Sequence, residues 1–130
     1  MIQRIQTIYL LMISIVAILG IFLFTPTEFV GFGLLTPVVL KIFFVLTGGL
    51  STLTLILFKR RKTQLSLNRL HYFFQILAAI GLVYEISNTN DLEALLPWLA
   101  IPILILILLL LSSNAIKKDE DLIRSIDRLR

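Results

Sequence analysis

The chain has 130 residues, of which 58% are hydrophobic, and its mean hydropathy is +0.96. Soluble domains average about 45–50% apolar residues, so this composition excludes an ordinary water-soluble domain and favours a membrane protein. The absence of cysteine excludes disulfides, thiolate nucleophiles and cysteine-ligated metals. The net charge of +4 is not accompanied by an aromatic platform, so no nucleic-acid partner is expected.

Four apolar segments are long enough to cross a bilayer, which takes about 20 residues for roughly 30 Å of hydrocarbon. The predicted transmembrane helices are residues 5–24, 37–58, 70–86 and 95–113, followed by a tail at 114–130. The third is the weakest, because it is short and carries His71, Gln75 and Glu85. The first is interpreted as an uncleaved helix, since its apolar run is too long for a signal peptide. We therefore expect one all-α domain over 1–130, a four-helix transmembrane bundle.

Positive charge is distributed unevenly along the chain. Of the 12 Lys and Arg residues, all except Lys41 precede the first segment, lie between the second and third, or follow the fourth. The other two connections, 25–36 and 87–94, contain none. The positive-inside rule then places both termini and the 59–69 loop in the cytoplasm. The prediction is a multi-pass protein of the bacterial cytoplasmic (inner) membrane, with the lipid bilayer as its first partner.

Small residues on the second and third segments predict how these two helices pack. Lipid provides little hydrophobic drive between helices, so small residues that permit close approach become important. In an antiparallel arrangement, Gly48 would meet Ala78 and Val45 would meet Gly81 in one continuous register. The predicted helix-packing residues are therefore Gly48, Ala78 and Gly81.

The same seam ends with Lys41 and Glu85 at similar shallow depth in the membrane. One charge in hydrocarbon costs at least about 2.5 kcal/mol, so the leading interpretation is a structural intramembrane ion pair. In a second interpretation, the Lys41 side chain extends to the interface and Glu85 is hydrated. In a third, the two residues form an ion or proton site.

The loop after the second segment begins with a basic cluster, Lys59, Arg60, Arg61 and Lys62. This cluster is expected to determine topology. The alternative is that it binds anionic lipid headgroups, with each charge contributing about 1 kcal/mol near the surface. The single histidine, His71, is interpreted as an interfacial or packing residue, because a metal site needs more ligands than this segment offers.

The tail at 114–130 is predicted to form a short amphipathic cytoplasmic helix. Its apolar positions fall on one helix face and are Leu122, Ile123, Ile126 and Leu129. Charges of both signs occupy the other face, which suits a docking helix for a protein partner or a helix lying on the membrane surface. A solvated extension of the fourth segment is the remaining alternative.

At three places the chain resembles a family of small bacterial four-helix membrane proteins that is a domain of unknown function. The resemblance rests on the opening MIQRIQTIYL, on Asn68-Arg69-Leu70 and on the ending AIKKDEDLIRSIDRLR. It covers the whole length, but only the two ends are specific, and the outer loops look shorter than is usual for the family. The resemblance implies a cytoplasmic-membrane location and four helices, and it supplies no catalytic residue.

No nucleophile–base set, phosphate loop, dinucleotide fingerprint or zinc motif occurs in the sequence. We therefore expect no catalytic residues, no metal and no cofactor, and the chain is not predicted to be an enzyme. The leading hypothesis is an accessory or assembly subunit of an inner-membrane complex, or a homo-oligomer, because charged ends flank featureless helices. The alternative is a transporter or channel subunit with Lys41 and Glu85 along a polar path. An enzyme acting on lipid is the least supported hypothesis.

Overall fold

The computed structural model is an all-α bundle, and it describes residues 3–23, 37–89 and 92–128. Its helices are α1 (Gln3–Leu23), α2 (Pro37–Ile56), α3 (Arg61–Thr89) and α4 (Leu92–Arg128). All four are long and apolar enough to cross a membrane. A helix satisfies its own backbone hydrogen bonds, which is the condition for a single segment to cross hydrocarbon. The four-helix fold expected from hydropathy is therefore confirmed.

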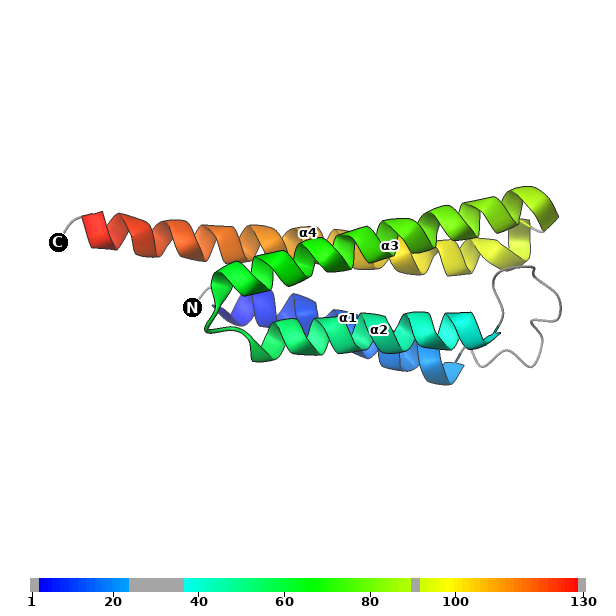
Figure 1. The fold of residues 1–130 in the computed structure, drawn as a ribbon, viewed down its shortest axis with the longest axis horizontal. Helices are drawn as coiled ribbons and strands as arrows, with labels where there is room; N and C mark the ends of the chain where they lie inside the picture. Colours follow the sequence, from blue (N-terminus) through cyan, green and yellow to red (C-terminus); the bar gives the residue numbers. More distant parts are fainter. Residues whose placement is uncertain (1–2, 24–36, 90–91, 129–130) are drawn as a thin grey trace.

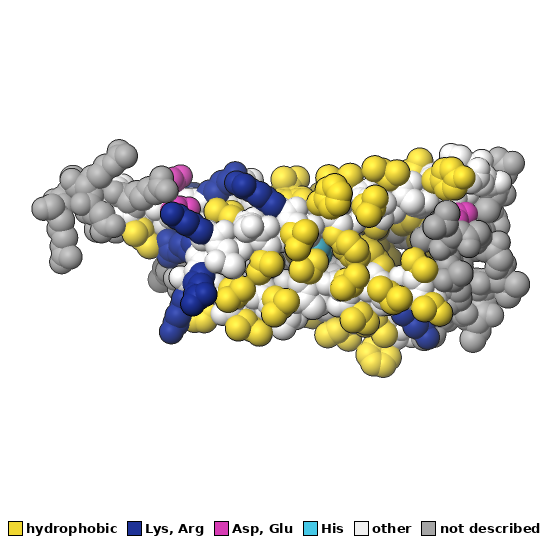
Figure 2. All heavy atoms as spheres, in the orientation of Figure 1, with side chains coloured by type: hydrophobic (Ala, Val, Ile, Leu, Met, Phe, Trp, Pro, Cys, Tyr) yellow, Lys and Arg dark blue, Asp and Glu magenta, His cyan; other side chains and the backbone are white. Residues whose placement is uncertain are grey.

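The helices form a ring in which each is antiparallel to the next and α4 returns to α1 (Figure 1). α1 packs closely on α2 and on α4, and α3 packs closely on α4, whereas α2 and α3 contact each other much less. The start of α1 and the end of α4 lie at the same end of the bundle. We call this the basic end, because most of the Lys and Arg side chains gather there (Figure 2).

Both α3 and α4 extend beyond the apolar segments that predicted them. α3 already begins at Arg61, so the predicted 59–69 loop is mostly helical and the turn between α2 and α3 is short. α4 continues without a break from the fourth apolar segment to Arg128, and its last turns project past the bundle (Figure 1). Hydropathy identifies only the apolar part of a helix, so it misses the polar turns at the ends. These turns can stay helical because no proline interrupts α3 or the part of α4 after Pro102.

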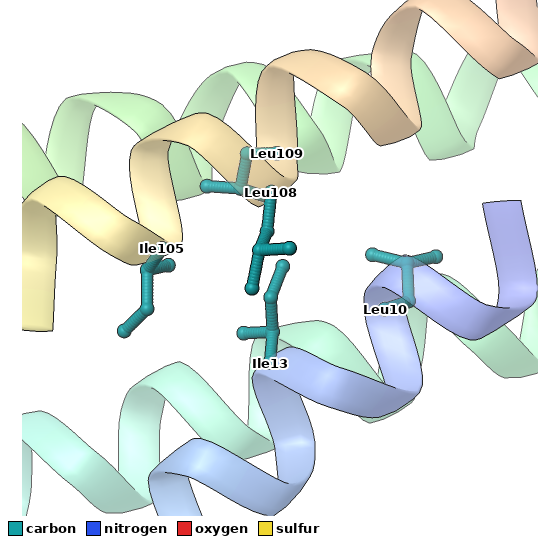
Figure 3. Close-up of a cluster of buried hydrophobic side chains, with 5 residues drawn as sticks. All are labelled: Leu10, Ile13, Ile105, Leu108 and Leu109. Atoms are coloured by element: carbon teal, nitrogen blue, oxygen red, sulfur yellow. The ribbon is translucent and has the colours of Figure 1, made fainter.

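Two apolar clusters hold the helices together. The first joins α1 to α4 and consists of Leu10, Ile13, Ile105, Leu108 and Leu109 (Figure 3). The second lies toward the opposite end and consists of Leu40, Phe44, Leu82 and Trp98. The outside of the bundle is also apolar, with Phe22 74% and Phe73 68% exposed. A surface of this kind suits lipid, in which apolar side chains need not be buried.

Two glycines bring α1 and α2 close together. A Cβ at Gly48 would lie 3.3 Å from the Cβ of Ala17, and Gly20 lies directly against the ring of Phe44. Gly48 therefore packs α2 against α1. The predicted pairing of Gly48 with Ala78 is wrong, and Val45, another α2 residue of that seam, is 58% exposed.

Candidate functional site

A column of buried polar side chains runs along α3 through the basic half of the bundle. It consists of Gln64, Asn68, His71 and Gln75, each no more than 1% exposed. Their spacing of four, three and four residues places them on one helix face, over roughly 16 Å of helix length. Polar side chains are costly in hydrocarbon. This face therefore turns inward, and the apolar faces form the outside of the bundle. We call these four residues the polar column.

The polar column bridges α3 to α2 through side-chain amides. Nε2 of Gln64 donates a hydrogen bond to the backbone oxygen of Thr54 at 2.9 Å. Nε2 of Gln75 donates to Oγ1 of Thr47 at 3.0 Å. Both bonds are buried, and they connect two helices whose backbones are otherwise in little contact. The basic half of the α2–α3 interface is therefore joined mainly by polar contacts.

Further buried hydrogen bonds connect the remaining helices near the same depth. Nδ2 of Asn68 donates to Oγ of Ser113 on α4 at 3.1 Å. Oγ of Ser51 on α2 donates to the backbone oxygen of Leu10 on α1 at 2.6 Å. Interhelical bonds of this kind are a recognised source of helix association in lipid. Each of the four helices thus takes part in the hydrogen bonding of the interior.

Several polar atoms of this interior have no hydrogen-bond partner among the described residues. They are Gln64 Oε1, Asn68 Oδ1, His71 Nδ1, Tyr72 Oη, Gln75 Oε1 and Ser112 Oγ. Buried polar atoms in proteins are almost always hydrogen-bonded to protein or to ordered water. The polar column therefore has spare hydrogen-bonding capacity along its whole length.

His71 lies in the middle of the column and is fully buried. Its Nε2 lies 3.2 Å from Nε2 of Gln75. With the Gln75 amide assigned in this orientation, its nitrogen donates and the ring Nε2 accepts, which is the tautomer that carries the proton of a neutral ring on Nδ1. Nδ1 has no hydrogen-bond partner within the described ranges, and the acceptor Oδ1 of Asn68 lies on the preceding turn of the same face. No group of three or more metal-ligating side chains occurs in the described part of the chain.

The opposite half of the α2–α3 interface contains an apolar groove of about 550 Å³. The rings of Phe43 and Phe74, which line it, stack at 5.5 Å with an interplanar angle of 19°. Ala78 and Gly81 also line the groove, and a Cβ added to Gly81 would meet nothing within 4 Å. The predicted packing residues of α3 thus border an opening and not a helix seam.

The structure does not bring Lys41 and Glu85 together. Lys41 is exposed, Glu85 is 4% exposed, and no ion pair between them occurs in the described ranges. The inward face of α2 is marked by the buried residues Leu40 and Phe44. At about 100° per residue, Lys41 lies about 100° from Leu40 and about 60° from Phe44 around the helix, so it sits at the edge of that face with its side chain exposed. Glu85 shares the inward face of α3 with the polar column.

One ion pair lies at the basic end. Arg61 Nη2 and Asp119 Oδ2 are 2.6 Å apart, with the side chains 21% and 16% exposed. The pair ties the first turn of α3 to the projecting part of α4. Beside it, a hollow of about 570 Å³ lies between the basic cluster, residues 59–62, and Glu120 and Ile123 of α4.

The predicted docking tail is helical to Arg128 and continuous with α4. Leu122 and Ile123 are 44% and 43% exposed. The side chains of Ile126 and Leu129 lie outside the described residues. The tail therefore presents at least two large, partly exposed apolar side chains within one turn after Asp119.

Sequence analysis missed the polar column, although its signal is present in the sequence. Polar residues recur in α3 at steps of four, three and four, and in α2 at Thr47, Ser51 and Thr54, at steps of four and three. All three α2 residues are fully buried. In a membrane helix, such a polar stripe is a better indicator of the inward face than small residues are.

One protein-family model matches the chain, over residues 32–129, and its description is "Domain of unknown function (DUF4293)". The matched region includes Asn68-Arg69-Leu70 and nearly all of the tail, two of the three places on which the resemblance rests. No curated protein and no solved structure matches the chain.

Proposed function

The chain belongs to the family described as a domain of unknown function (DUF4293), and we propose that it is a multi-pass membrane subunit that binds a second membrane-embedded chain. The proposed role is accessory or assembly binding, without catalysis. The partner is a larger membrane complex or another copy of this chain. The observation that carries the proposal is the apolar groove of about 550 Å³ between α2 and α3.

The groove has the properties of a helix-packing surface. Its α3 wall runs from Phe74 to Tyr84, roughly 15 Å or nearly three helical turns. Ala78 and Gly81 supply small residues within that wall, and close approach at small residues drives helix association in lipid. The tight pairing of α1 with α2 at Gly48 is an example of such packing within this chain. A partner helix in the groove would complete the weakly packed α2–α3 side of the ring.

Two glycine substitutions test this surface. Gly81→Leu would fill the groove, whereas Gly49→Leu would add the same side chain at an exposed position that does not line it. A Cβ at either glycine meets nothing within 4 Å, so neither change should disturb the bundle itself. In mild detergent, we expect the wild-type chain and Gly49→Leu to keep a bound chain in native mass spectrometry, and Gly81→Leu to lose it. A wild-type monomer without partners, or equal masses for both variants, would contradict the proposal.

We also propose that the basic end faces the cytoplasm of a bacterial inner membrane, as the positive-inside rule predicts. The chain has no cysteine, so single cysteines can be labelled without background. Ser125 lies near the basic end and Ser87 near the opposite end, and both are exposed. A membrane-impermeant maleimide added to intact spheroplasts should label Ser87→Cys and spare Ser125→Cys. The reverse pattern would overturn this orientation.

The tail is a second proposed binding segment, through Leu122 and Ile123. Truncation after Asp121 would remove both residues and would retain the Arg61–Asp119 ion pair. We expect the truncated chain to remain folded. In affinity purification, it should lose the partners that bind through the tail. An unchanged set of co-purifying chains would restrict partner binding to the groove.

A further inference from the structure

Unpartnered hydrogen-bonding atoms recur on every turn of the polar column. Among the described residues, Gln64, Asn68 and Gln75 each leave an amide oxygen without a hydrogen-bond partner, and His71 leaves Nδ1 without one. Every one of these side chains is at least nine-tenths buried. Isolated buried polar groups are destabilising, and in proteins they are met by ordered water where space and partners allow. A bound polar molecule or ion in this interior would supply the missing hydrogen bonds.

The arrangement of the unpartnered atoms favours water over a cation. They are distributed over roughly 16 Å of α3, whereas a cation needs several oxygen ligands around one point. The column is uncharged while His71 is neutral. The acid on the same helix face, Glu85, follows Gln75 by about 15 Å along the helix. Water molecules need two to four polar partners each, which a series of amide and hydroxyl groups can supply in succession.

The two ends of the column differ. At the basic end it begins at Gln64, one helical turn beyond the exposed Arg60. At its inner end it stops at Gln75, because the next buried residue on this face of α3 is the apolar Leu82. Leu82 belongs to the apolar cluster that contains Phe44. The column is thus close to the surface at one end and closed by apolar side chains at the other.

We propose that the polar column binds a chain of water molecules that reaches from the basic end to His71 and gives solvent protons access to the buried interior of the bundle. One water bridges Nδ1–H of His71 to Oδ1 of Asn68. The ring passes its Nδ1 proton to this water and takes a proton back from the same chain. The ring returns to the same tautomer and no net charge moves. Because Leu82 and its neighbours close the far end, the path is one-sided and is not a channel.

Solid-state NMR of the full-length chain in lipid vesicles tests this proposal. His71 is the chain's single histidine, so its ring signals are assigned without ambiguity. We expect magnetisation to transfer from water to the His71 ring and to the Asn68 side chain, and the Nδ1 proton to exchange in deuterated buffer. A ring that receives no magnetisation from water and keeps its proton would show a dry column and overturn the proposal.

Two variants test which side chains hold the water beside His71. Asn68→Leu removes the bridging acceptor and should abolish water transfer to His71, and Ser112→Ala, which removes only a hydroxyl, should reduce it. Ser66→Ala changes an exposed serine at the same depth of α3 and should leave the transfer unchanged. A folded Asn68→Leu chain with wild-type transfer would overturn the proposal. If that variant does not fold, the Ser112→Ala and Ser66→Ala pair decides the question.

Two further measurements exclude the other possible occupants and paths. Replacing sodium by choline at constant ionic strength should leave the His71 signals in place, and a shift would show a bound cation and overturn the water chain. Vesicles containing the chain should hold a pH gradient as long as empty vesicles do. A proton leak that Asn68→Leu removes would show a continuous channel and overturn the one-sided path.

Discussion

Substituting alanine for Gly20 should destabilise the bundle, although alanine is the better helix former. A Cβ at this position would lie 2.5 Å from Cδ1 and 2.6 Å from Cζ of the Phe44 ring. Carbon atoms in good contact are about 3.5–4.0 Å apart, so the overlap approaches about 1 Å. Phe44 is 2% exposed and packs against Trp98 with 6.5 Å between ring centroids. Phe44 also lines the groove between α2 and α3, so the ring could relieve the overlap only by shifting within this packed cluster toward the groove and losing present contacts.

The size of the effect follows from comparison with Gly49→Ala. Both changes gain helix propensity, at most about 1 kcal/mol each, and Gly49 is open to lipid with nothing within 4 Å of an added Cβ. Overpacking of a filled core costs about 1–3 kcal/mol. The gain in helix propensity cancels when the free energies of unfolding of the two variants are subtracted. The remaining difference is the cost of the clash. We expect Gly20→Ala to be less stable than Gly49→Ala by about 1–3 kcal/mol.

Unfolding with sodium dodecyl sulfate in mixed micelles provides the assay. The chain has one tryptophan, Trp98, which is 8% exposed beside Phe44 and reports on this contact by its fluorescence. The double variant Gly20→Ala/Phe44→Leu should recover part of the lost stability, because the smaller side chain makes room for the new methyl group. Equal unfolding midpoints for Gly20→Ala and Gly49→Ala would refute the close packing of α1 on α2.

Three further predictions use the same unfolding assay. Gln75→Leu and Thr47→Val should each lower the free energy of unfolding by about 0.5–1.5 kcal/mol. The coupling energy of the double mutant should be about 0.6 kcal/mol, a typical value for hydrogen bonds between membrane helices. Zero coupling would argue against the bond between these two side chains. Ser51→Ala should cost about 1 kcal/mol through loss of its bond to α1, and an unchanged midpoint would count against that bond. Asp119→Ala should cost less than about 1 kcal/mol, since its partner Arg61 is partly exposed, and the loss should vanish in high salt. A large, salt-independent loss would show that the ion pair is buried more deeply.

The packing of α2 shows where prediction from sequence fails. Gly48 is a small residue on a plausible seam, and the sequence pattern alone pairs it with α3. In the structure it contacts Ala17 of α1, and the side of α2 that faces α3 carries Thr47 and Thr54. A glycine allows close approach by any neighbouring helix, so it does not identify which neighbour uses it. Polar side chains discriminate better, because lipid excludes them from the outer surface.

The same distinction explains the outcome for Lys41 and Glu85. Their similar depth follows from counting residues along two apolar segments, and this was the basis for predicting an ion pair. Whether two residues at one depth meet depends on the rotation of each helix about its axis. Glu85 turns inward with the polar column of α3, and Lys41 lies exposed at the edge of the inward face of α2, which Leu40 and Phe44 occupy.

Hydropathy and charge along the chain are enough to predict the number of helices, their places in the chain and the gathering of positive charge at one end. These properties follow from each segment alone. A segment that crosses a membrane must form its backbone hydrogen bonds within itself, and its apolar side chains must extend across the hydrocarbon. The tertiary structure decided the ring order, the rotation of each helix, the polar interior and the groove between α2 and α3. These depend on all four helices at once, since lipid leaves apolar faces nearly equivalent and only mutual packing and hydrogen bonding select among them.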